Sequence, residues 1–427
     1  MKILIKNGRI IDPSQSLDKK EDILVVDGKI EKIGKISVSD GVIFDAKERI
    51  VAPGFIDMHT HLREPGFEDK ETIETGTKAA IKGGFTTVCA MPNTEPACDS
   101  QAQVRFILDK AKASARAAVL PIGAITKGRK GEYLSEMRDL KDAGCVAISD
   151  DGSSVENAML MRKAMEYASM VGLVVISHCE VQELAKHGVM NEGYWSMVLG
   201  LNPIPKEAES LMVERDIELA ELTGAKLHIA HVSVKRSVEA IRRGKKRGVN
   251  VTAEVTPHHL TLTDEELKNY DTNFKVNPPL RTKEDIEALK DGLKDGTIDV
   301  IATDHAPHLE SEKEKEFDFA PFGMIGLETA FSLCVKELIE KKYLTWSELI
   351  EKFTIAPSRI LGYDRGSLKP GKIADIVVID PSRDWVYEKQ GICSKSFNSP
   401  FIGWQLPSVI TDVFVGGRAV VRDGKAR

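Results

Sequence analysis

Two histidines that lie two residues apart, His59 and His61, stand near the end of an apolar segment that spans residues 55–62. Side chains at positions i and i+2 of a strand point to the same side, so both imidazoles would share one face at the end of a strand. Two imidazoles in this arrangement can ligate one cation. The spacing therefore indicates a metal site, provided that other ligands converge on it.

Four further apolar segments end in side chains that can bind a metal. Together with the first pair they give six candidate ligands: His59, His61, Asp151, His178, His231 and Asp304. Four imidazoles and two carboxylates are more than one tetrahedral zinc ion needs, so we expect two metal ions. A carboxylate such as that of Asp151 can bridge them.

Strand alternation selects these residues over their neighbours. Asp151 shares a face with the small side chain of Ser149, which suits a crowded barrel interior, whereas Asp150 would face the opposite way. His231 and His228 lie three apart and face opposite sides, and the same argument favours His231. Alternation also turns Asp304 toward the narrow interior.

Other candidate ligands are interpreted as structural. A thiolate at Cys179, next to His178, would be a good soft zinc ligand, but alternation points it away from the metals and favours a buried thiol. His258 and His259 follow the seventh predicted strand, and we interpret both as structural. His187 is expected in a helix, as a surface or packing residue.

A basic and two amide side chains stand close to the candidate ligands in sequence or in the predicted topology. Arg63 follows the first histidine pair, and its planar guanidinium matches a carboxylate. Asn93 ends the second predicted strand and can join the same anion, while Asn277 lies in a long connection toward the same face. These residues indicate a dinuclear metal hydrolase that acts on a small anionic substrate.

A charged run, residues 310–316, follows the last predicted strand. Such a run is often only solvated surface. Because it interrupts a loop that leaves the side of the candidate site, a lid over that site is an equal alternative.

The elements that must position these residues alternate between strand and helix in the middle of the chain. Eight strands are expected at residues 55–62, 86–92, 117–126, 145–151, 173–180, 226–233, 249–256 and 299–305. Seven helices are expected at residues 72–82, 101–114, 134–143, 157–171, 209–223, 234–243 and 283–295. This pattern predicts an α/β fold with a (β/α)8 barrel, in which the chemistry lies at the carboxyl ends of the strands.

The two ends of the chain are rich in strands and turns instead. Residues 1–53 contain alternating segments joined at Asp27-Gly28, a strong hairpin signal, and residues 363–427 have the same character. Neither end is large enough for a good sandwich by itself. We therefore expect the two ends to form one small β-sandwich domain beside a barrel at residues 54–362.

Composition excludes several classes of function. The 427 residues are 42% hydrophobic and 29% charged, which is ordinary for a globular protein, and the net charge of −6 argues against nucleic-acid binding. No apolar run reaches the roughly 18 to 20 residues that span a bilayer. Six cysteines without a CxxC pair favour a cytoplasmic protein.

The motifs at residues 53–61, 61–66, 91–94, 149–152 and 303–308 look familiar together. The first, with the ligand set and the strand-rich ends, resembles the amidohydrolase superfamily; the others look like bacterial class I dihydroorotase. The resemblance covers essentially the whole chain. It implies reversible cyclisation of N-carbamoyl-L-aspartate to (S)-dihydroorotate in pyrimidine (UMP) biosynthesis.

The resemblance also implies roles for individual residues. Zinc would be held by His59, His61, Asp151, His178, His231 and Asp304, and Asp304 would also be the catalytic proton carrier. The substrate would be held by Arg63, Asn93, Asn277 and His308, with backbone help near Phe322 and Gly323. Dihydroorotase relatives often associate with aspartate carbamoyltransferase, so this partner, or a homo-oligomer, is plausible.

Two rival functions remain open. One is another cyclic amidase, such as an allantoinase or a hydantoinase; a neutral ring would not need the anion grip of Arg63 and Asn93. The other is a catalytically silent relative that serves as a partner of aspartate carbamoyltransferase, although such relatives generally lose metal ligands and this sequence keeps all six. Hydantoinases and dihydropyrimidinases usually also keep a carbamylated lysine on the fourth strand, and residues 145–152 contain no lysine.

We predict that activity does not depend on bicarbonate. A bridging lysine must first react with carbon dioxide, whereas Asp151 is a ready carboxylate. The test strips the metal and restores zinc under carbon-dioxide-free gas, with and without bicarbonate. Recovery that requires bicarbonate would mean that a lysine elsewhere supplies the bridge.

Overall fold

Eight parallel strands in the middle of the chain form a barrel. The computed structural model describes residues 1–427, and neighbours in the barrel sheet follow one another in chain order. A parallel bridge between Thr60 and His305 brings the last strand back to the first. The strands are β6 (Phe55–Thr60), β7 (Phe85–Ala90), β8 (Ala118–Gly123), β9 (Ala147–Ser149), β10 (Val174–Ser177), β13 (Leu227–Ile229), β14 (Val251–Val255) and β15 (Val300–Ile301). The predicted barrel is confirmed.

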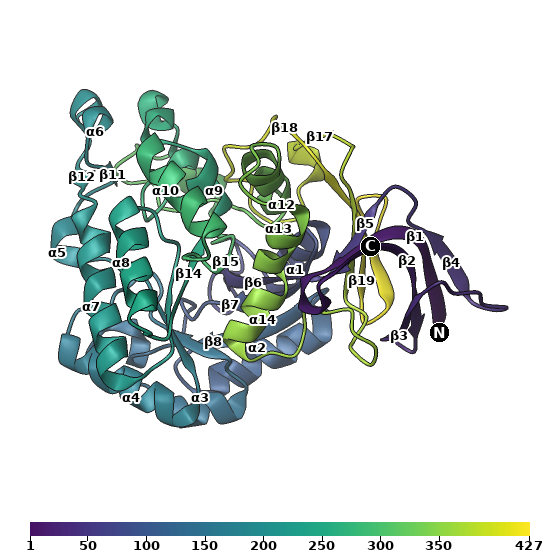
Figure 1. Ribbon diagram of the computed structural model, residues 1–427. Coiled ribbons are helices and arrows are strands. Elements are labelled where there is room, and N and C mark those ends of the chain that lie inside the picture. The colour runs from purple at the N-terminus through teal and green to yellow at the C-terminus, as the bar shows by residue number, and fades with distance from the viewer.

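Helices surround this sheet (Figure 1). All seven predicted helices are present: α1 (Ile73–Lys82), α2 (Gln101–Ser114), α3 (Met137–Ala143), α4 (Ala158–Val171), α7 (Glu207–Thr223), α8 (Lys235–Lys246) and α10 (Lys283–Lys294). Sequence signals set their ends: Thr72 caps the first turn of α1, and Gly172, at φ +72°, ends α4 in the left-handed region. Apolar residues on their inner faces complete the largest core of the molecule.

Helices that the sequence analysis did not predict follow the last barrel strand. They are α12 (Ala330–Cys334), which continues into one π-helical turn at Val335–Ile339, α13 (Trp346–Phe353) and α14 (Ile355–Leu361). Phe331 and Phe353 pack against Phe55 of β6, with ring centroids 4.9 and 5.3 Å away. These helices therefore seal the side of the barrel where the first strand meets the last.

Short elements make up the connections. They are α5 (Gln182–Ala185), β11 (Met190–Asn191), α6 (Tyr194–Leu199), β12 (Pro203–Ile204), α9 (Pro257–Thr261) and α11 (Glu310–Lys313), with 3-10 turns at Pro13–Gln15, Lys127–Arg129, Asp264–Asn269, Thr272–Phe274 and Lys389–Gly391. The predicted charged run thus begins in a helical turn, α11. None of the helices combines the length and the apolar composition that crossing a membrane requires.

A buried carboxylate joins the first barrel strand to the last. Asp57 Oδ1 accepts from the backbone N–H groups of His59 and Thr303 at 3.0 and 3.1 Å, and Oδ2 accepts from Thr303 Oγ1 at 2.6 Å. Burial raises the pKa of Asp57 to about 7, against these hydrogen bonds. The contact fixes two strand ends, each next to a candidate ligand.

Strands from both ends of the chain pair in one nine-stranded sheet. The first end supplies β1 (Lys2–Asp12), β2 (Leu17–Val26), β3 (Lys29–Gly34), β4 (Val42–Asp45) and β5 (Ile50–Pro53); the second supplies β16 (Ile376–Asp380), β19 (Val409–Val415), β20 (Arg418–Arg422) and β21 (Lys425–Ala426). β16 pairs antiparallel with β5, and Asp27-Gly28 turns β2 into β3. The union of the two ends in one small β unit with its own core is confirmed (Figure 1).

One segment near the C-terminus leaves this sheet. It begins at β17 (Trp385–Val386), ends at β18 (Gln405–Leu406) and lies against the barrel. Its residues Tyr387 and Phe401 are buried in one apolar cluster with Val276 and Met324 of the barrel connections. The second end of the chain therefore contacts the barrel loops as well as the sheet.

Candidate active site

The six candidate ligands meet at the carboxyl ends of the barrel strands. His61 Nε2 lies 3.0 Å from Asp304 Oδ1, and His59 Nε2 lies 3.3 Å from Asp151 Oδ1. The same oxygen, Asp151 Oδ1, lies 3.7 Å from His178 Nδ1 and 3.6 Å from His231 Nε2. The structure thus brings together all six side chains that alternation selected.

Five of the six ligands form two groups that share one residue. Asp151 lies with His59 and His61 in one group and with His178 and His231 in the other, and the ligand atoms within each group are all within 4.8 Å of one another. A carboxylate common to two sets of imidazoles has the position that a bridging ligand occupies. This grouping fits two metal ions.

The hydrogen bonds of the histidines test that fit. His59 donates Nδ1–H to Glu254 Oε1 at 2.6 Å, and His61 donates Nδ1–H to Asn93 Oδ1 at 2.7 Å. In each neutral ring Nε2 is then an acceptor that faces a carboxylate oxygen. The buried atoms His59 Nε2 and Asp151 Oδ1 have no hydrogen-bond partner in the protein. Acceptors that face one another are stable only with a cation between them, which is either a proton on Nε2 or a metal ion.

Three buried carboxylates give this region its charge. Burial opposes a proton on His59, but the carboxylates of Asp151 and Glu254 outweigh burial and raise the pKa of His59 well above its ordinary value. Burial would also favour the neutral form of Asp304, but His59 and His61 hold the pKa of that carboxyl below its usual range. A field that attracts a proton in this way also attracts a divalent cation.

Glu254, on β14, is a residue that the sequence analysis missed. It is fully buried; Oε1 accepts from His59 Nδ1 and, at 3.2 Å, from the backbone N–H of His231, and Oε2 accepts from His228 Nε2 at 3.1 Å. One carboxylate therefore orients ligands of both groups. Its signal in the sequence is a lone acidic residue in an otherwise uncharged strand, Val251–Val255.

A cavity of about 220 Å³ opens over the ligands. Eleven of the twelve predicted site residues line it: His61, Arg63, Asn93, Asp151, His178, His231, Asn277, Asp304, His308, Phe322 and Gly323, together with Gly152 and Ala306. His59 is the exception, because its ring is fully buried beside the cavity. The candidate metal ligands and the candidate substrate residues therefore share one pocket.

Arg63 is the main cationic group of the pocket. Its Nε donates to Pro307 O at 3.1 Å, and its Nη2 lies 3.2 Å from His308 Nε2. Burial lowers the pKa of Arg63 to about 10, so the guanidinium stays charged at neutral pH. Burial also lowers the pKa of His308, to about 2, and that ring is neutral.

Asn93 has a second task beside the substrate contact that was predicted for it. Its Oδ1 accepts from His61 Nδ1, which leaves only the amide NH2 group for a ligand in the cavity. Asn277 lines the opposite part of the pocket, and its buried Oδ1 has no hydrogen-bond partner. Both amides can therefore contact a polar substrate.

The residues interpreted as structural lie outside the pocket. Cys179 Sγ lies 3.4 Å from Ser177 Oγ and 3.6 Å from Asp216 Oδ2, and burial raises the pKa of this thiol well above its ordinary value. His259 bonds to Thr256 Oγ1 and Pro278 O, at 2.7 and 2.9 Å.

Two further histidines complete this set. His258 is buried next to His259, and burial lowers its pKa to about 4. His187 is exposed, but the expectation of a helix there is wrong: it lies in the turn after α5, at φ +63°. An αL residue ends the short helix instead of extending it.

The closed barrel, the paired ligand groups and the small polar pocket define a metal-dependent amidohydrolase. A family model described as dihydro-orotase-like matches residues 48–237. The dihydroorotase of Acetivibrio thermocellus is 53% identical over 422 residues, which cover 99% of this chain and 99% of that protein. The dihydroorotase of Pelotomaculum thermopropionicum is 54% identical over 425 residues, again 99% of both. The chain belongs to the dihydroorotase family.

Solved structures support the same fold. An L-hydantoinase (dihydropyrimidinase) from Arthrobacter aurescens superposes with a TM-score of 0.91 at 25% identity, over 100% of this chain and 97% of that one. A D-hydantoinase (dihydropyrimidinase) from Thermus sp. gives a TM-score of 0.87 at 25% identity, over 100% and 96%. The expected barrel with its added β unit is therefore shared with these enzymes.

We predict that Glu254→Gln weakens metal binding about 10- to 100-fold, because a neutral amide orients His59 less strongly than a carboxylate does. Competition with a coloured chelator measures the affinity. Glu192→Gln, at an exposed position, is the matched control. Equal affinity in the two variants would exclude Glu254 from orienting the ligands.

Proposed function

We propose that this dihydroorotase is of the bacterial class I type and that it interconverts N-carbamoyl-L-aspartate and (S)-dihydroorotate in de novo pyrimidine (UMP) biosynthesis. The observation that carries the proposal is the carboxylate of Asp151, common to both ligand groups, on a strand end that contains no lysine. A cyclic amide with a carboxylate suits the adjacent pocket, because Arg63 offers a buried cation there.

Zinc is the metal that we propose, with two ions per subunit. His59, His61 and Asp304 would hold one, His178 and His231 the other, and Asp151 would bridge them. When bound, such a pair supplies a water whose pKa is lowered toward neutrality and polarises the carbonyl of the ring amide. Imidazoles and carboxylates are ordinary zinc ligands, which is the support for this choice.

Asp304 is the proposed proton carrier. Its pKa is held below the usual range, so it is ionised at neutral pH and can accept a proton from the attacking water. It then delivers that proton to the ring nitrogen as the amide bond breaks. In the direction of ring closure, both transfers reverse.

Arg63, Asn93, Asn277 and His308 would orient the substrate. The guanidinium of Arg63 pairs with the substrate carboxylate, and the Asn93 amide NH2 group donates to the same anion. The backbone at Phe322 and Gly323 would bond to the rest of the ring. Such positioning brings the scissile carbonyl over the ligand cluster and excludes unproductive poses.

A hydantoinase is the rival that the solved structures suggest, since two of them carry that name. The buried Arg63 favours an anionic ring over a neutral one. A silent relative is disfavoured because every metal ligand is present. We also propose a cytoplasmic location. The proposed partner is aspartate carbamoyltransferase or another copy of this chain. The proposed domains are a barrel at residues 54–362 and a β-sandwich formed by residues 1–53 and 363–427.

We expect Asp304→Asn to keep most of its metal and to lose about 100- to 10,000-fold in kcat, as is typical when a general base is removed. Dihydroorotate hydrolysis by the zinc-supplemented protein, with the metal content measured in the same sample, gives both quantities. Asp109→Asn, at an exposed position, is the control. Full turnover by metal-loaded Asp304→Asn would assign the proton transfer to another group.

Arg63→Lys should lower kcat/KM for dihydroorotate about 10- to 100-fold, because lysine keeps the charge but loses the fork of two N–H groups. A ring substrate that lacks the carboxylate should be little affected. Arg105→Lys, on the exposed face of α2, serves as the control. Equal losses for both substrates would mean that Arg63 is structural.

A further inference from the structure

A buried amide from the far end of the chain lies directly behind the pocket. Asn398 belongs to the segment between β17 and β18, and its side chain is 4% exposed. Its Oδ1 accepts from the backbone N–H of His308 at 3.0 Å. Its Nδ2 donates to Ala306 O at 2.9 Å and to Gly323 O at 3.1 Å. All three bonded residues line the cavity over the metal ligands.

These bonds fix the orientation of the amide. One side meets an N–H donor and the other meets two carbonyl acceptors, so a flipped amide would oppose like groups on both sides. The side chain thus joins two parts of one loop, residues 306–308 and residue 323. Ile325 N–H also donates to Asn398 O at 3.0 Å, which anchors the backbone of Asn398 itself.

The tied loop is the one that holds the anion-binding side chains. Pro307 O, between two residues that Asn398 contacts, accepts from Arg63 Nε. Phe322 O, next to Gly323, accepts from His308 Nε2 at 2.8 Å. The position of Arg63 and the orientation of His308 therefore both depend on backbone that Asn398 fixes.

The two parts of the loop are in close contact where Asn398 bonds to them. Gly323 lies at φ +129°, and a Cβ there would stand 2.7 Å from the Cβ of Ala306. A second buried donor, Lys313 Nζ, reaches Gly323 O at 3.0 Å and Pro321 O at 2.9 Å. Both donors lie on the outer side of the loop, away from the reacting groups.

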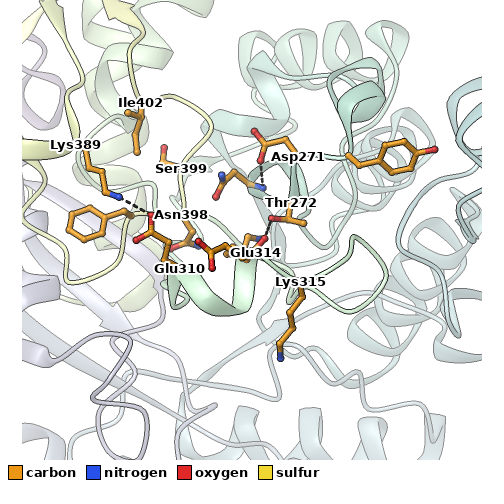
Figure 2. Close-up of a pocket in the computed structure, with 13 residues that line it drawn as sticks. Asp271, Thr272, Glu310, Glu314, Lys315, Lys389, Asn398, Ser399 and Ile402 are labelled. Atoms are coloured by element: carbon orange, nitrogen blue, oxygen red, sulfur yellow. Dashed lines mark hydrogen bonds and ion pairs between the residues drawn. The ribbon is translucent and has the colours of Figure 1, made fainter.

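A separate cavity of about 480 Å³ lies on that outer side of the loop. Figure 2 shows Asn398 in the wall of this cavity, beside Ser399 and Glu310. Asn398 lines this outer cavity and is not among the residues that line the substrate pocket. It makes no hydrogen bond to any of the six candidate ligands, so its influence on the pocket passes through its three hydrogen bonds to the loop.

We propose that Asn398 is a positioning residue for substrate binding: it holds His308 and the Gly323 backbone so that the pocket presents Arg63 to the substrate anion and keeps the His308 ring in place beside it. The proposal rests on the proposed dihydroorotase function. It gives the segment between β17 and β18 a role in supporting the substrate pocket, although the segment lies outside the barrel strands and helices. Because the metal ligands are untouched, the effect belongs to substrate affinity rather than to the chemical step.

The test compares Asn398→Ala with Asn273→Ala in the full-length, zinc-loaded protein. Asn273 lines the same outer cavity, and its only hydrogen bond there is made by its backbone, to Asp271. We expect KM for dihydroorotate to rise about tenfold or more in Asn398→Ala, with kcat within about threefold and unchanged metal content, since three hydrogen bonds to the loop are lost. Asn273→Ala should match the wild type.

A second pair of variants tests the route through His308. If Asn398 acts through that residue, Asn398→Ala should raise KM much less in a His308→Ala background than in the wild type.

Asn398→Asp keeps the acceptor for His308 N–H but opposes two carbonyls with a carboxylate, and should also raise KM. It provides the measurement if Asn398→Ala does not fold.

The outcomes separate the two proposals. A zinc-loaded wild type that does not turn over dihydroorotate overturns the proposed function, and the role of Asn398 with it. An active wild type whose Asn398 variants retain the wild-type KM, or lose kcat and metal together, overturns the positioning role alone.

Discussion

Three carboxylates buried together at one end of the barrel, Asp151, Asp304 and Glu254, are the constraint on which the structure depends. Groups of like charge removed from water repel one another and lose hydration, so they remain ionised only with positive charge beside them. A proton on His59, whose pKa these carboxylates raise, or bound metal cations would supply that positive charge. The surrounding fold must therefore hold three carboxylates together against their mutual repulsion.

The backbone around the ligands reflects this demand. Arg63, His231 and Asp304 have φ values of +63°, +30° and +49°, which side chains other than glycine rarely adopt. Each follows the end of a barrel strand, where the chain turns sharply while its side chain still points into the mouth. Asp57 bonds to the backbone at the ends of the first and last strands, at Thr303 next to Asp304 and at His59. Strain of this kind persists only where such contacts over-determine the geometry.

The sequence was enough to predict the barrel, the joined β unit and the meeting of the six ligands. Alternation of side chains along a strand can be read from the sequence. In a barrel, the inward side chains at the strand ends all meet at one end, so Asp151 and His231 could be chosen over their neighbours. Glu254 was missed because it precedes the strand end and bonds beneath the ligands. His187 was wrongly predicted in a helix because a histidine does not signal left-handed backbone in the sequence as clearly as a glycine does.

The remaining misses involve contacts between distant parts of the chain. The helices after the last strand pack on Phe55, and Asn398 reaches the pocket from 90 residues beyond His308. No periodicity within either segment points to its partner. The charged run gave a similar difficulty: Lys313 is buried beneath the loop, whereas Glu310 pairs with Lys389 at the surface. Composition alone does not tell which charged side chain of the run is buried and which is at the surface.

The pairing of β16 with β5 affects the order in which the protein can fold during its synthesis. A ribosome releases residues 1–53 first, yet their sheet lacks its C-terminal partner strands until the last eighth of the chain emerges. The barrel can close earlier, since its strands are consecutive. The strands that carry the ligands are thus complete before the segment that holds Asn398 emerges, and a chain that ended before β16 would leave one edge of β5 unpaired, a surface on which nascent chains can associate.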